Sequence, residues 1–156
     1  MFFTFFSIVH VFRMSCFTVV KIESKLKSSY FVNNICIAAH AQQNRVVALL
    51  VPNFKVIKKF ARILSIVNKN TGTRDDNIYL CQNEQIRALV LKKLRHFGRN
   101  CGLKNCELPT DIILLDDDWT PENGLVTASF KIKRKTLEHF YAYDLGQLFH
   151  EHDTSQ

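Results

Sequence analysis

The chain has 156 residues, 47% hydrophobic and 22% charged, so it can bury the core of one ordinary globular domain. Its formal net charge of +7 favours anionic partners such as nucleotides, nucleic acid or anionic lipid, without choosing among them. The five cysteines are odd in number and include no C-x-x-C pair, which argues against a disulfide framework and for reduced, cytosolic thiols.

Residues 1–19 form an apolar leader that is rich in phenylalanine and is interrupted by His10 and Arg13. It lacks a basic start, which is poor for a signal peptide, and it is too broken for a transmembrane helix. An unrelated leader and a marginal membrane anchor both remain open. The pattern fits neither a helix nor a strand, so we expect Phe2, Phe5 and Ile8 to stay out of the core.

The next stretch predicts a helix followed by a hairpin. Apolar residues recur every four positions over 21–30, which indicates a short amphipathic helix. Val32–Ala39 and Val46–Val51 are apolar runs joined by polar residues, and together they predict a β-hairpin.

Two further helices are predicted from caps and periodicity. Asn53 follows Pro52 and is a candidate N-cap of a helix that reaches about Val67. Residues 68–76 are polar and predict a loop, with a short turn over 78–81. Asn83 then precedes a long basic helix from Glu84, whose solvated face explains its charge better than nucleic acid or membrane binding.

Thr110–Leu115 predicts a strand, and the acidic run Asp116–Asp118 follows it. Neither this run nor Cys101 with Cys106 is completed by further ligands at metal-binding spacing, so no metal site is predicted. A last helix is expected from Arg134 to about Phe149, ahead of a polar tail.

Before that helix, Pro121–Gly124 predicts a tight turn, because Pro presets φ and Asn-Gly tolerates positive φ. Leu125–Ile132 then predicts a strand, with Phe130 and Ile132 on one face and Lys131 and Lys133 on the other. Such a turn and strand can hold the ammonium group of a lysine in one position. A basic run that is simply solvated has the same composition, so this alternative stays open.

The same stretch, WTPENGLVTASFKIKR, resembles the C-terminal signature of the adenylate-forming enzymes. Within them it is similar to the long-chain acyl-CoA synthetases, also called long-chain fatty-acid–CoA ligases. Asn123 departs from the pattern, in which Thr is usual, and the resemblance extends over roughly residues 20–149. The matching residues are Trp119, Thr120, Pro121, Glu122, Gly124, Leu125, Val126, Thr127, Phe130, Lys131, Lys133 and Arg134.

This resemblance implies an α+β fold with a small three- to four-stranded sheet and helices packed mainly on one face. It implies that Lys131 is the catalytic lysine, which contacts the acyl-adenylate. It leaves open the roles of the other motif residues singled out as candidates, which are Thr120, Pro121, Gly124, Thr127, Phe130, Lys133 and Arg134.

The resemblance also implies a division of the chain into the leader 1–19, a C-terminal lid domain 20–150 and the tail 151–156. The family's reaction uses ATP, Mg²⁺, a long-chain fatty acid and CoA. This sequence has no Gly-rich phosphate loop, so we expect the nucleotide and acyl sites to lie on a missing N-terminal domain and the chain to be inactive alone. The absence of the family's hinge favours a truncated or mis-spliced product.

Intact relatives act on the cytosolic faces of endoplasmic reticulum, outer mitochondrial or peroxisomal membranes, which implies a cytosolic or weakly membrane-associated fragment here. Two other interpretations stay open: a non-catalytic interaction module derived from such a domain, and a small basic nucleic-acid-binding domain. The second is disfavoured because Phe130 is the only aromatic residue near the basic run, so no nucleic acid is expected.

Overall fold

The computed structural model describes residues 16–40, 45–66 and 74–151. The expectations for Phe2, Phe5 and Ile8 and for the tail from residue 152 concern positions outside these ranges. So do the connection 41–44 and most of the predicted loop 68–76.

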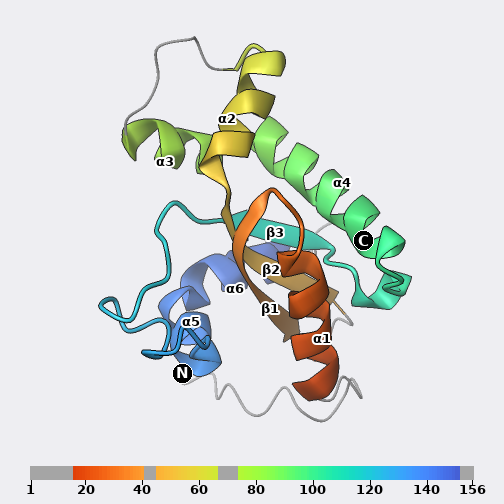
Figure 1. Cartoon of the computed structure of the whole chain (residues 1–156), viewed down its shortest axis with the longest axis vertical. Coiled ribbons are helices and arrows are strands. Elements are labelled where there is room, and N and C mark those ends of the chain that lie inside the picture. The colour runs from red at the N-terminus through yellow and green to blue at the C-terminus, as the bar shows by residue number, and fades with distance from the viewer. Residues whose placement is uncertain (1–15, 41–44, 67–73, 152–156) are drawn as a thin grey trace.

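Within the described residues, three strands form one sheet in the order β1-β2-β3 (Figure 1). β1 (Val32–His40) pairs antiparallel with β2 (Arg45–Pro52), as the hairpin pattern predicts. β3 (Asp111–Leu114) pairs parallel with β2, so the chain between them crosses over through helices. β2 is therefore the central strand, and its apolar run is buried on both faces.

Four helices cover one face of the sheet: α1 (Cys16–Lys27), α2 (Phe54–Ile63), α3 (Arg74–Gln82) and α4 (Glu84–Asn100). Their apolar sides meet alternate residues of the strands in a first core. Representative members of this core are Leu26, Ile57, Leu80 and Val90 from the helices and Ile35, Ile37, Ala48, Leu50 and Ile112 from the strands.

The other face carries α5 (Arg134–Phe140), α6 (Ala142–Glu151) and the segment before them (Figure 1). The intervening strand residues, with Trp119 and the apolar sides of these two helices, build a second core. The α+β prediction is confirmed, and four of the six α-helices in the described ranges lie on one face, in keeping with the expected imbalance.

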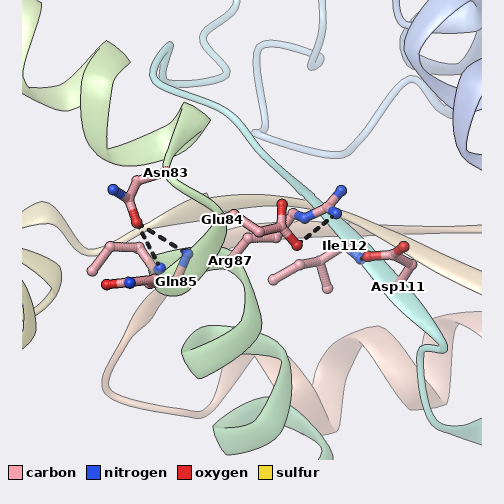
Figure 2. A network of polar contacts seen from close by, with 7 residues as sticks. Asn83, Glu84, Gln85, Arg87, Asp111 and Ile112 are labelled. Atoms are coloured by element: carbon pink, nitrogen blue, oxygen red, sulfur yellow. Dashed lines mark hydrogen bonds and ion pairs between the residues drawn. The ribbon is translucent and has the colours of Figure 1, made fainter.

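Asn83 caps α4 as predicted. Its side-chain oxygen accepts hydrogen bonds from the backbone N–H groups of Gln85 and Ile86 at 3.0 and 3.1 Å (Figure 2). Asn53 occupies the N-cap position of α2, but its side chain makes no cap bond there. Instead its Nδ2 donates to the carbonyl oxygen of Tyr30 at 3.2 Å, which ties α2 to the turn before β1.

Several predicted boundaries are wrong. The first helix, predicted over 21–30, begins at Cys16 and ends at Lys27, and Val19 packs against the first core. α2 ends at Ile63 because Ser65 adopts a positive φ of 56°. The expected turn over 78–81 lies inside α3. The last predicted helix is two helices, interrupted at Tyr141.

Candidate functional site

The turn at Pro121–Gly124 forms as predicted and is braced by Asn123. The N–H of Gly124 donates to the carbonyl of Pro121 at 3.1 Å, and Gly124 has a φ of 75°, which favours glycine. The side-chain oxygen of Asn123 accepts from the backbone N–H groups of Thr120 and Leu125 at 3.1 and 3.2 Å. Thus the residue that departs from the family pattern closes the turn.

The predicted strand over Leu125–Ile132 is wrong, because this segment folds back on itself as a tight hairpin. Val126 and Ile132 form an isolated antiparallel bridge, and the N–H of Lys133 donates to the carbonyl of Leu125 at 3.0 Å. At the tip, the N–H of Thr127 donates to the carbonyl of Lys131 at 2.8 Å, while Phe130 donates back to the Thr127 carbonyl at 2.8 Å. Lys131 therefore follows a turn and does not sit within a strand.

Thr127 fixes the backbone of Lys131 through its side chain. Its hydroxyl oxygen accepts from the Lys131 N–H at 3.1 Å and lies 3.0 Å from the Ser129 hydroxyl. Phe130 occupies the left-handed position of the loop with a φ of 58°, a conformation that a bulky side chain adopts only under constraint. The hydrogen bonds of Thr127 supply that constraint, so the hairpin holds the lysine backbone in one geometry.

The side chains of the hairpin do not alternate as a strand would require. Phe130 is 67% exposed, whereas Ile132 is half-buried against the second core, so the two do not share one face as predicted. Lys131 and Lys133 are both exposed. The side chain of Lys131 is thus exposed to solvent, on a loop whose backbone is hydrogen-bonded to Thr127.

Arg134, directly after the hairpin, points into the protein. Its Nη2 lies 2.8 Å from Oε2 of Glu23 in α1, and its Nη1 donates to the carbonyl of Ile37 in β1 at 2.8 Å and contacts the Cys36 sulfur at 3.4 Å. The other carboxylate oxygen of Glu23 accepts from the Ile37 N–H at 2.7 Å. Arg134 therefore anchors the lysine hairpin to the first helix and the edge strand.

Electrostatics at this anchor favour the charged pair. Burial acts to lower the pKa of Arg134, but its hydrogen bond to Glu23 and the neighbouring acidic groups outweigh burial and raise it. Burial raises the pKa of the Cys36 thiol to about 12, so Cys36 is a neutral neighbour of the pair. Sequence reasoning missed Glu23, which lies 111 positions before Arg134 and carries no local signal.

All eight candidate residues lie in the single segment Thr120–Arg134, with different orientations. Lys131, Lys133 and Phe130 face solvent, Thr127 and Gly124 shape the loop, and Arg134 binds inward.

Over the described ranges, no group of three or more His, Cys, Asp or Glu side chains is placed to hold a metal ion. In the same ranges no helix is both long and apolar enough to cross a bilayer.

Comparison with solved structures shows which known proteins share this fold. The chain superimposes on the A domain of carboxylic acid reductase from Segniliparus rugosus, solved with AMP and a co-purified carboxylic acid, with a TM-score of 0.68 and 22% identity. The match covers 85% of this chain and 18% of that one. The adenylation domain of a carboxylate reductase from Mycobacterium chelonae gives a TM-score of 0.67 at 21% identity, over 84% and 17% of the two chains. The fold is that of one part of the adenylate-forming domains.

Sequence comparison narrows this class. The chain is 35% identical over 121 residues to long-chain-fatty-acid–CoA ligase 1 of Schizosaccharomyces pombe, covering 77% of this chain and 17% of that protein. It is 33% identical over 129 residues to long chain acyl-CoA synthetase 8 of Arabidopsis thaliana, covering 83% and 17%. No protein-family model matches it. By sequence, the chain is a relative of the long-chain-fatty-acid–CoA ligases, and it spans less than a fifth of their length.

Proposed function

We propose that the chain is the lid domain of a long-chain fatty-acid–CoA ligase and that Lys131 is its catalytic residue for adenylate formation. The observation that carries the proposal is the placement of Lys131. Lys131 lies on a loop, its backbone N–H is hydrogen-bonded to the Thr127 hydroxyl, and the residue is exposed. The 35% identity to a long-chain-fatty-acid–CoA ligase over 121 residues supports reading this lysine through the family motif.

The proposed reaction has two steps. A fatty-acid carboxylate attacks the α-phosphate of ATP to give acyl-adenylate and pyrophosphate, and the CoA thiol then displaces AMP. Negative charge grows on the oxygens around the α-phosphate during the first step. A preplaced ammonium stabilises that charge with little reorganisation. Among the residues that the structure describes, no group of three or more His, Cys, Asp or Glu side chains is placed to hold a metal ion, so no residue of this chain is assigned as a Mg²⁺ ligand.

The test is Lys131→Ala in a full-length ligase that carries this domain. We expect adenylate formation from ATP and palmitate to fall by about two to three orders of magnitude, equivalent to roughly 3–4 kcal/mol of lost transition-state stabilisation. Transfer of the acyl group to CoA from supplied acyl-adenylate should change far less. The two half-reactions are measured by pyrophosphate release and thioester formation.

Lys133→Ala is the matched control, because Lys133 is also exposed on the same hairpin and is expected to matter less. The 156-residue chain alone serves as the blank and should make no palmitoyl-CoA. The proposed role of Lys131 is wrong if its alanine variant adenylates within about threefold of wild type. It is also wrong if both half-reactions suffer equally.

A further inference from the structure

A cavity of about 390 Å³ lies between α4 and the short turn that connects α1 to β1. Its apolar lining is supplied by Phe31, Leu89 and Phe97. Phe31 and Phe97 belong to the first core, on the face of the sheet covered by α1–α4, whereas the Lys131 hairpin packs on the second core. The cavity is therefore separate from the site proposed for adenylation.

The basic side chains at the cavity come from successive turns of α4. Lys92, Lys93 and His96 line it, and no Asp or Glu among the described residues does. The ammonium of Lys93 lies 4.8 Å from the ring centre of Phe60 in α2, a cation–π contact with a residue outside the cavity lining. Among the described residues, neither lysine forms an ion pair with a carboxylate. The cavity therefore presents positive charge beside an apolar surface.

Tyr30 adds an aromatic face to the same cavity. Its side chain is 62% exposed, although Tyr30 sits next to Phe31, which is 2% exposed. The two rings meet edge to face, with centroids 5.3 Å apart and an interplanar angle of 86°. The backbone carbonyl of Tyr30 is held by the Asn53 amide, so the exposed ring stands on a fixed turn. Such a ring can stack a flat ligand.

We propose that this cavity binds a nucleotide, with the base on Tyr30 and the apolar lining and the phosphates at Lys92, Lys93 and His96. The volume lies in the range of small-molecule sites. A stacking ring beside basic groups matches a ligand that joins an aromatic base to phosphate. The lack of carboxylates among the described lining residues disfavours cationic ligands. The exposed aromatic ring favours a base over an aliphatic chain.

The experiment uses the 156-residue chain and ADP carrying a fluorescent N-methylanthraniloyl group, followed by anisotropy at low salt and by competition with unlabelled ADP. We expect saturable binding that unlabelled ADP displaces. The Lys92→Ala/Lys93→Ala double variant should bind at least roughly tenfold more weakly. Tyr30→Leu should weaken binding by about fivefold or more, through loss of stacking.

One variant serves as the control and is expected to bind like wild type. Lys59→Ala removes an exposed lysine of α2 that does not line the cavity, so it reports non-specific charge effects. Circular dichroism of every variant verifies that each one is folded.

Four results would overturn the proposal. The first is no saturable binding, and the second is equal loss in the Lys59→Ala and double-lysine variants. The third is binding of inorganic phosphate as tightly as ADP, which would remove the role of the base. The fourth is capture of the chain by phosphatidylserine vesicles with the same lysine dependence and without competition by ADP, which would assign the face to a membrane.

Discussion

Replacing Arg134 by methionine should destabilise the fold, because it removes one partner of a largely buried ion pair. Glu23 is only 8% exposed and would keep its hydrogen bond from the Ile37 N–H but lose the guanidinium, while the Ile37 carbonyl loses its donor from the same group. Leaving a fully buried charge unpaired costs about 3–5 kcal/mol. The Arg134 side chain is 30% exposed, so water can compensate part of the loss. We therefore expect about 2–3 kcal/mol.

Glu23→Gln should cost less than Arg134→Met, about 1 kcal/mol of unfolding free energy. The amide oxygen can still accept a hydrogen bond from the Ile37 N–H. The guanidinium of Arg134 keeps its hydrogen bond to the Ile37 carbonyl and its access to water. Urea unfolding of the 156-residue chain, followed by circular dichroism, measures both changes. The double variant should lose clearly less than the sum of the two single variants, since both remove the same interaction.

The matched control is the Arg87–Glu84 pair of α4, which has a similar separation of 2.9 Å (Figure 2). Glu84 is 73% exposed, so Glu84→Gln should change the free energy of unfolding by no more than about 0.5 kcal/mol. If Arg134→Met is no more damaging than Glu84→Gln, the anchor described for the lysine hairpin contributes nothing to stability and the reasoning fails.

Two further predictions concern glycine and cysteine positions. In Gly98→Ala the new methyl would lie 2.5 Å from a side-chain carbon of buried Leu108, so overpacking should outweigh the better helix propensity and cost about 1 kcal/mol. In Gly146→Ala the new methyl meets nothing within 4 Å, so this variant should be stabilised by up to about 1 kcal/mol. Thermal unfolding of the two variants measures these changes, and equal effects on both would contradict the prediction. Because burial raises the pKa of the Cys36 thiol from 9.0 to about 12, the folded chain retains that proton where the unfolded chain loses it. The stability of wild type relative to Cys36→Ala should be fully present below pH 9 and fall by about 1.4 kcal/mol per pH unit between pH 9 and about 12. Urea unfolding of both proteins measures this difference, and a difference that stays constant between these pH values would refute the assignment.

Elements with strong local signals were predictable from the sequence. The hairpin of β1 and β2 follows from two apolar runs, and α4 follows from the Asn83 cap and four-residue periodicity. The Pro121–Gly124 turn follows from its own residue types. In each case the local preference agrees with the packing that the fold imposes.

The elements that failed depend on distant contacts. α3 begins with polar residues that favour loops, yet Leu80 is drawn into the first core and the segment is helical. The lysine segment alternates like a strand, but no glycine or asparagine marks the left-handed position that Phe130 occupies. The inward orientation of Arg134 depends on Glu23, which no local pattern connects to it.

The parallel pairing of β3 with β2 has a consequence during protein synthesis. Thr110, which docks beside β3 on the carbonyl of Val46, lies 64 positions later in the chain. At typical translation rates the free edge of β2 therefore waits roughly 3–13 s for its second neighbour after it leaves the ribosome. Throughout that interval the apolar run Val46–Val51 has one unpaired edge, so a nascent chain stalled before β3 would offer that edge to chaperones or to other nascent chains.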